Sequence, residues 1–173
     1  LDKAAENVMK VIGLAGWSGA GKTTLLTRVI PQLQKQGLRV SVIKHAHHAF
    51  DVDQPGKDSW LHREAGAHEV LVASGARWAL LHEHRGAAEP PLAELLARMS
   101  PCDLLLVEGF KQEVNPRLEV YRASCGQPPL TLADDGICAV ATDDAAIFRG
   151  RPGLQCLPLD DEAAVLDYIL ARA

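Results

Sequence analysis

Nine residues near the amino end carry the clearest chemical signal in this sequence of 173 residues. They run Gly16-Trp17-Ser18-Gly19-Ala20-Gly21-Lys22-Thr23-Thr24 and match the pattern G-x-x-x-x-G-K-T. Glycines let the backbone turn so that several N–H groups point into one concave loop, which suits a phosphate. In this pattern Lys22 reaches the β- and γ-phosphates of a nucleotide, and the Thr23 hydroxyl ligates a bridging Mg²⁺. We therefore predict that these nine residues bind a nucleoside triphosphate.

The segments on both sides of this loop supply the context that the pattern requires. Residues 11–15 form a short apolar run typical of a buried strand, and residues 25–30 are apolar at helical spacing. A phosphate would then sit at the amino end of a helix, where N–H groups and the helix dipole attract anions. A glycine-rich turn with a chance lysine is the alternative. We expect a strand at 10–15 and a helix at 22–36 that Pro31 kinks or ends early.

A second element of such sites is an acidic residue at the end of a buried strand. Residues 103–107 are nearly all apolar, and Glu108 follows them. A carboxylate at that point can hold Mg²⁺, directly or through water, or orient an attacking water. We predict that Glu108 is a metal ligand and a catalytic residue. An exposed loop carboxylate is the alternative, and Asp103 lies at the wrong end of the strand.

The polar loop at 44–58 follows the second expected strand, so it should lie near the γ-phosphate. Asp51 and Asp53 are two residues apart and share a face if the segment is extended. We predict Asp51 as a metal ligand and Asp53 as a catalytic residue that contacts metal or water. The loop would then act as a switch that responds to the phosphate.

The same loop holds further polar groups, and three interpretations of it stay open. It could contact phosphate or substrate through Lys44 and Lys57, or it could hold a transition metal through histidines and aspartates. It could also be a solvated polar loop. The histidines are His45, His47 and His48.

Residues that follow a late strand are candidates for reading the base. Thr142 and Asp143 come directly after the expected strand at 137–141. A carboxylate there can accept hydrogen bonds from guanine N1–H and N2–H₂. We predict that both residues contact the nucleotide. The alternative is that Asp143 and Asp144 cap the next helix, and no N-K-x-D string marks guanine specificity.

The remaining pattern alternates strands and helices. Further strands are expected at 39–43, 69–73, 77–81, 103–107, 118–122 and 137–141, and further helices at about 59–65, 90–99 and 162–172. The first strand, first helix and second strand form a βαβ unit, which implies parallel pairing. The strands at 69–73 and 77–81 suggest a hairpin that adds an antiparallel edge. The sequence thus predicts a three-layer α/β P-loop NTPase fold with a mostly parallel sheet and its ligand at the strand carboxyl ends.

Composition narrows the functional classes. The net charge of −4 and the scattered Lys and Arg residues argue against nucleic-acid binding. No apolar run approaches the roughly 20 residues of a membrane span. The cysteines form no C-x-x-C pair, so we expect reduced thiols in a cytoplasmic protein: Cys102, Cys125, Cys138 and Cys156.

The length fits one domain. Residues 1–8 are polar, and Met9 looks like a natural start. We therefore expect residues 1–8 to be a short extension or cloning remnant, and residues 9–173 to form a single P-loop NTPase domain.

From Met9 onward the chain resembles one known family, the molybdopterin-guanine dinucleotide biosynthesis adapter protein B of bacteria and archaea. The P-loop alone is generic. The more specific marks are Ile43-Lys44-His45-Ala46-His47-His48, Asp51-Val52-Asp53-Gln54-Pro55-Gly56-Lys57-Asp58-Ser59, Arg77-Trp78-Ala79-Leu80 and Leu106-Val107-Glu108-Gly109-Phe110-Lys111.

The resemblance implies a dimeric P-loop protein related to signal-recognition GTPases, with GTP and Mg²⁺ as cofactors and weak GTPase activity. It implies a homodimer that uses the hairpin at 77–81, and a partner, the guanylyltransferase that joins GMP to molybdopterin. Molybdopterin itself is a further candidate ligand. Hydrolysis should be slow, because no glutamine or arginine finger is identifiable.

Two other functions remain open at this point. One is a small-molecule kinase of the P-loop class, although the dispersed Arg85, Arg98, Arg117 and Arg122 do not suggest a lid. The other is a binding module that uses nucleotide without hydrolysing it. Transfer of labelled γ-phosphate to a small acceptor would indicate the kinase, and turnover at buffer background would indicate the binding module.

Overall fold

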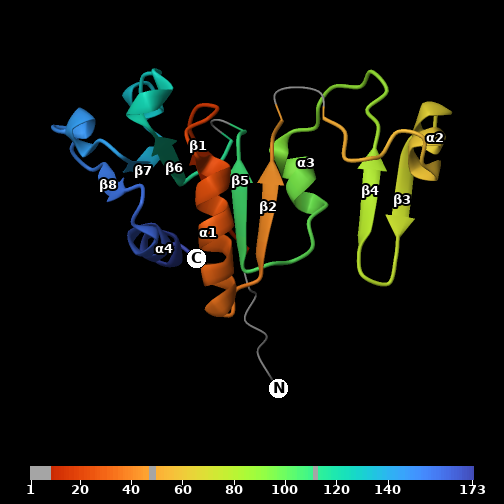
Figure 1. Ribbon diagram of the computed structural model, residues 1–173, viewed down its shortest axis with the longest axis horizontal. Coiled ribbons are helices and arrows are strands. Elements are labelled where there is room, and N and C mark those ends of the chain that lie inside the picture. The colour runs from red at the N-terminus through yellow and green to blue at the C-terminus, as the bar shows by residue number, and fades with distance from the viewer. Residues whose placement is uncertain (1–8, 47–49, 111–112) are drawn as a thin grey trace. The chain divides into compact units, whose positions relative to one another are not determined.

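The computed structural model describes residues 9–46, 50–110 and 113–173 (Figure 1). The chain forms two compact units. The first, here called the sheet unit, comprises the chain up to His45 and from Ser100 onward. The second, here called the hairpin unit, comprises Ala46–Met99. Each unit is described by itself.

The sheet unit is built on six parallel strands in the order β2-β5-β1-β6-β7-β8. Their bounds are β1 Lys10–Ala15, β2 Val40–Lys44, β5 Leu104–Glu108, β6 Arg117–Tyr121, β7 Ile137–Thr142 and β8 Gln155–Pro158. Leu104, Leu105, Leu106 and Val107 are all completely buried. Their apolar run therefore forms a strand covered on both faces, as expected for the centre of a parallel sheet.

Two α-helices contribute to the main core of this unit: α1, Lys22–Lys35, and α4, Glu162–Leu170. The buried residues of α1, which include Leu25, Val29 and Leu33, recur at spacings of four and lie on one face of the helix. The Asp161 side chain accepts a hydrogen bond from Ala164 N at 3.0 Å and caps α4. Burial of each of these leucine and valine side chains of α1 contributes about 1.5–3 kcal/mol to stability.

Short 3₁₀ helices complete the sheet unit: η1 Ala123–Cys125, η2 Leu130–Leu132 and η3 Ala145–Phe148. Phe148 of η3 packs edge-on against Tyr121, with ring centroids 5.4 Å apart, and Val140 joins this second cluster. The face of the sheet that holds this cluster is therefore covered at least in part by a 3₁₀ segment.

The hairpin unit contains α2 Asp58–Glu64, the antiparallel strands β3 Glu69–Ala73 and β4 Trp78–His82, and α3 Leu92–Ala97. The two strands form a sheet of their own. Ser74 stabilises the turn, since its hydroxyl contacts the carbonyl oxygen of Arg77 at 3.0 Å.

The predicted α/β P-loop fold with a mostly parallel sheet is confirmed, and three details are corrected. β1 and β2 do not pair, because β5 lies between them. The hairpin is a separate two-stranded sheet rather than an edge of the main one. Strand β8 was not predicted. It has only four residues and ends in a proline, which strands tolerate only at positions such as the sheet edge that β8 occupies.

Pro31 does not end α1, which continues to Lys35. Proline removes one helical hydrogen bond, but Leu33 beyond it is completely buried. The helix nevertheless continues for four residues beyond Pro31, and Leu33 packs into the main core. In the described parts of the chain, no helix has the length and apolar character needed to cross a bilayer.

Candidate functional site

The loop between β1 and α1 has the backbone shape that its glycines predict. Gly16, Gly19 and Gly21 have φ angles of 138°, 83° and 101°, all in the left-handed region. A Cβ atom on Gly16 would overlap the carbonyl oxygen of Val120 in β6. The loop therefore passes so close to the sheet that only glycine fits at this position.

Lys22 is the first residue of α1 and folds back over the loop. Its Nζ donates hydrogen bonds to the carbonyl oxygens of Gly16, at 2.7 Å, and Trp17, at 3.0 Å. Burial lowers the pKa of this ammonium, the Glu108 carboxylate opposes that shift, and the Lys44 ammonium adds to it. A cation held over a glycine loop in this way is suited to phosphate oxygens.

The amino end of α1 leaves its N–H groups available. Gly21 is the N-cap residue, no side chain caps the helix, and the first turn holds no acidic residue. The first N–H groups of a helix lack partners within the helix, and the dipole there is positive. This helix start therefore fits an anion.

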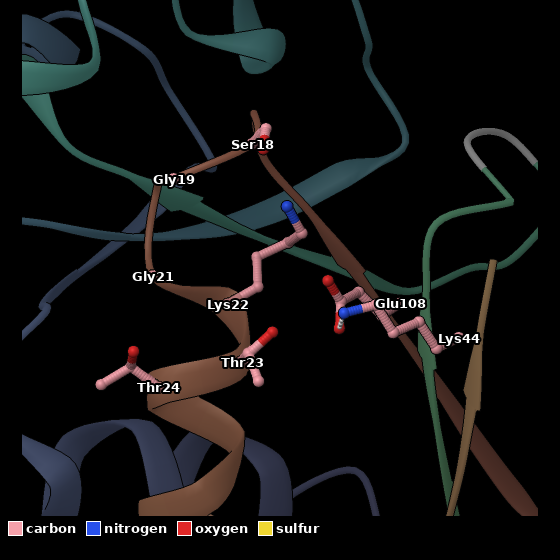
Figure 2. A pocket seen from close by; sticks show the side chains of 8 residues that line it. All are labelled: Ser18, Gly19, Gly21, Lys22, Thr23, Thr24, Lys44 and Glu108. Atoms are coloured by element: carbon pink, nitrogen blue, oxygen red, sulfur yellow. Dashed lines mark ion pairs between the residues drawn. The ribbon is translucent and has the colours of Figure 1, made fainter. Parts of the chain in front are cut away.

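A cavity of about 270 Å³ lies over the loop and the first turn of α1 (Figure 2). Most of the predicted phosphate-binding residues line it together with two residues from neighbouring strands: Ser18, Gly19, Gly21, Lys22, Thr23, Thr24, Lys44 and Glu108. The structure thus brings the predicted acid Glu108 into the same cavity as Lys22 and Thr23.

Lys44 and Glu108 end neighbouring parallel strands in direct register. Lys44 Nζ lies 3.7 Å from Glu108 Oε2, and the two side chains are 57% and 11% exposed, respectively. Figure 2 shows both side chains lying beside Lys22 and Thr23. The segments that follow β2 and β5 approach each other closely here, because a Cβ on Gly109, at φ 94°, would lie 2.7 Å from His45 Cβ.

The donor set fits a magnesium–nucleotide complex. Thr23 and Glu108 supply oxygen, which Mg²⁺ prefers, and phosphates and water complete its shell in sites of this kind. Among the described residues, no group of three or more His, Cys, Asp or Glu side chains could hold a metal by itself. The alternative of a transition-metal site thus finds no support in that part of the chain, and His47 and His48 lie outside it.

Thr142 is the last residue of β7 and Asp143 follows it, so the strand ends one residue later than predicted. The Thr142 hydroxyl accepts a hydrogen bond from Asp144 N at 3.0 Å, and Asp144 caps η3 through Ala146 N. Asp143 instead accepts from Ala123 N at 3.1 Å and lies 3.9 Å from the Arg122 guanidinium.

Arg122 connects that region to the P-loop, a relationship that sequence reasoning missed. A Cβ on Gly21 would lie 3.3 Å from Arg122 Nε. Trp17 ties the other end of the loop, since its indole N–H donates to the carbonyl oxygen of Pro128 at 2.8 Å. The only sequence signal for Arg122 is its place directly after β6.

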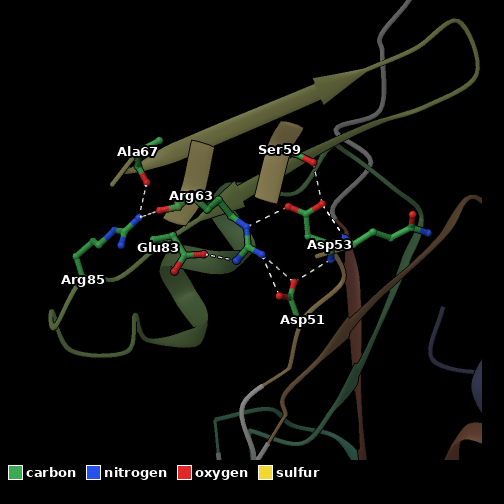
Figure 3. A network of polar contacts seen from close by, with 8 residues as sticks. Asp51, Asp53, Ser59, Arg63, Ala67, Glu83 and Arg85 are labelled. Carbon is green, nitrogen blue, oxygen red and sulfur yellow. Dashed lines mark hydrogen bonds and ion pairs between the residues drawn. The ribbon is translucent and has the colours of Figure 1, made fainter. Parts of the chain in front are cut away.

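Asp51 and Asp53 are held within the hairpin unit by Arg63 (Figure 3). Arg63 Nη2 lies 3.0 Å from both carboxylate oxygens of Asp51, and Nε lies 3.1 Å from Asp53 Oδ2. Its Nη1 lies 2.8 Å from Glu83 Oε1. One guanidinium thus joins three carboxylates.

Hydrogen bonds lower the pKa of both aspartates. For Asp51 the backbone N–H of Asp53 acts first and Arg63 second, and for Asp53 the main cause is the Ser59 hydroxyl. Arg63 was not a predicted site residue. One signal was present, because Ser59 and Arg63 are four residues apart on α2 and so share the face that meets Asp53.

The fold and this site define a class of protein. A glycine loop between β1 and α1, a lysine over that loop and an acid at the end of β5 are the parts of a P-loop protein, a class whose fold suggests nucleotide binding.

Comparison with known proteins gives the family. The family model of molybdopterin guanine dinucleotide synthesis protein B, MobB, matches residues 11–143, and the chain belongs to this family. The molybdopterin-guanine dinucleotide biosynthesis adapter protein of Escherichia coli is 42% identical over 95% of this chain and 88% of that protein. Its counterpart in Haemophilus influenzae is 44% identical over 79% of this chain and 76% of that protein.

Solved structures agree with this assignment. A crystal structure of molybdopterin-guanine biosynthesis protein B superimposes with a TM-score of 0.69 at 28% identity, covering 93% of this chain and 97% of the other. Bacillus subtilis MobB superimposes with a TM-score of 0.74, covering 95% and 98%. Its identity of 22% means that this second likeness supports the fold alone.

Proposed function

We propose that this chain is a GTP-binding adapter in the biosynthesis of molybdopterin guanine dinucleotide, with weak GTPase activity. The observation that carries the nucleotide part is Lys22, whose ammonium is held over a glycine loop by two carbonyl oxygens. The pathway part rests on the family and on the names of its relatives.

Lys22, Thr23 and Glu108 have separate roles in this proposal. Lys22 and the loop amides bind phosphate oxygens in place of the carbonyl contacts that Lys22 now makes. Thr23 and Glu108 hold Mg²⁺, directly or through water. The bound ion neutralises charge on the β- and γ-phosphates.

Hydrolysis is slow in this proposal, because the sequence holds no recognisable glutamine or arginine finger. Such a finger accelerates the reaction by roughly 10³–10⁵-fold where one exists. Asp51 as a metal ligand and Asp53 as a catalytic residue stay predictions. Either one has to exchange its contact with Arg63 for the new partner.

Guanine selection is assigned to Thr142 and Asp143 at the end of β7. Support comes from the position of Asp143 beside Arg122, which itself lies against Gly21 of the loop. The Asp143 carboxylate would exchange its contact with Arg122 for the guanine N1–H and N2–H₂ donors.

We propose that the adapter works in the cytoplasm as a homodimer, with the guanylyltransferase as its partner and molybdopterin as a further candidate ligand. The hairpin supports a protein interface, because large apolar side chains of β3 and β4 are exposed: Leu71 by 61%, Trp78 by 65% and Leu80 by 43%. Exposed apolar patches of this kind mark interaction surfaces.

Nucleotide competition by titration calorimetry tests the nucleotide part. We expect GTP to bind more tightly than ATP, and Mg²⁺ to strengthen GTP binding. Tighter binding of ATP, or no effect of Mg²⁺, would contradict the proposal. A phosphotransfer screen separates the kinase alternative: label released slowly as free phosphate supports the adapter, and label on a small acceptor supports a kinase.

A further inference from the structure

Lys44 is a second cation in the cavity that holds Lys22. It reaches the cavity from the end of β2, whereas Lys22 reaches it from α1. Its ammonium lies 3.7 Å from Glu108, and its side chain is more than half exposed. Because the lysine side of this ion pair is exposed, the pair adds little net stability and the ammonium can leave Glu108 when another anion enters the cavity. The role of Lys44 therefore lies in ligand binding by the cavity.

The strand order places Lys44 at one end of the bound nucleotide. The loop and Lys22 follow β1, the proposed base contact Asp143 follows β7, and Lys44 is the last residue of β2. In the sheet order β2-β5-β1-β6-β7, Lys44 and Asp143 lie on opposite sides of the loop. A nucleotide with its base toward β7 thus directs its terminal phosphate toward β5 and β2.

We propose that Lys44 is the residue that distinguishes a nucleoside triphosphate from a diphosphate, an inference that rests on the proposed function. In the nucleotide-free protein its ammonium pairs with Glu108. With a triphosphate and Mg²⁺ bound, Glu108 would serve as a ligand of the metal, and the Lys44 ammonium would pair with the terminal phosphate instead.

This exchange keeps every charge partnered. Glu108 is mostly buried, so leaving it without a counter-charge would be costly, and Lys44 supplies one until Mg²⁺ arrives. Lysine suits the second role because its compact ammonium sits on a flexible stem. A diphosphate has no γ-phosphate for the ammonium to contact, so Lys44 does not strengthen its binding.

The test compares two ligands with Mg²⁺ present, a non-hydrolysable GTP analogue and GDP, by titration calorimetry. Lys44→Met should weaken analogue binding by roughly tenfold. This is the lower end of the range for a hydrogen bond to a charged group, because the ammonium gives up its contact with Glu108 when it binds the phosphate. GDP binding should change less than about twofold. Lys44→Arg should retain the preference for the analogue. Lys10→Met is the matched control, since Lys10 is exposed at the opposite end of β1 and should change neither affinity.

Two results would overturn the inference: an equal loss for both ligands, or an analogue affinity that Lys44→Met leaves unchanged. Thermal unfolding of each variant accompanies the titrations, and Lys44→Gln replaces Lys44→Met if the latter is unstable. Failure of the proposed function looks different, because the wild-type protein would then bind neither ligand.

Discussion

Arg63 and Asp53 are joined by an ion pair in the hairpin unit, with Arg63 Nε 3.1 Å from Asp53 Oδ2. The same guanidinium contacts Asp51 and Glu83, so one side chain connects the segment before α2 to the segment after β4. Ser59 adds a hydrogen bond to Asp53 at 2.8 Å. Each of the three guanidinium nitrogens contacts a different carboxylate, so the rigid planar fork of Arg63 fixes their geometry as well as balancing their charge.

Replacing Arg63 should loosen this segment. In Arg63→Gln the carboxylates of Asp51 and Asp53 lose their shared cation, and amide hydrogen exchange across residues 51–59 should become several-fold faster. Arg77→Gln, in the turn of the hairpin, is the control. Exchange that stays at the wild-type rate would show that Arg63 does not hold the loop.

The same contacts predict a dependence on pH. The folded-state pKa values of Asp51 and Asp53 lie below the ordinary 3.8, so these carboxylates add stability above that pH. That stability is lost as the pH falls through the lowered values. The difference in urea midpoint between wild type and Arg63→Gln should therefore be constant near neutral pH and shrink below about pH 4. A difference that grows on acidification would have the wrong sign.

Glu108→Gln tests the proposed metal contact. The amide is a poorer Mg²⁺ ligand, so GTP affinity with Mg²⁺ should fall by roughly tenfold or more. GTP affinity in the presence of EDTA should not fall, because the amide removes a negative charge beside the phosphates and releases Lys44 from its ion pair. The measurement is titration calorimetry under both conditions, and identical behaviour of variant and wild type would remove Glu108 from the site.

Two glycines of the P-loop offer a matched pair. Gly16→Ala forces a Cβ into the Val120 carbonyl oxygen, whereas nothing lies within 4 Å of a Cβ on Gly19. Both residues have positive φ, so both substitutions carry some strain. We expect losses in the free energy of unfolding of about 2–4 kcal/mol for Gly16→Ala and about 1 kcal/mol for Gly19→Ala. Equal losses in urea unfolding would show that the close approach to β6 is not a constraint.

Local patterns predicted much of this structure. The start of α1 at Lys22 and the bounds of β1 follow from a glycine motif between two apolar segments, and both agree with the structure. Glu108 at the end of β5 follows from a nearly continuous apolar run. Each of these features depends on residues close together in the sequence.

Relationships across the sequence were harder to predict. Nothing local indicates that β5 inserts between β1 and β2, because strand order depends on packing between distant segments. The same holds for the contact of Lys44 with Glu108, 64 positions away, and of Arg63 with Glu83. The spacing of Asp51 and Asp53 predicted a shared face if the segment is extended, but it gave no sign of Arg63, the cation that contacts both from α2.

The central claim is that Lys22 and its glycine loop enclose the phosphates of GTP. Its most direct test is titration of GTP with Mg²⁺ into wild type, Lys22→Ala and Lys35→Ala, where Lys35 is the last residue of the same helix. We predict saturable binding to wild type and Lys35→Ala, and no detectable binding to a folded Lys22→Ala. Equal GTP affinity of Lys22→Ala and wild type would contradict the account.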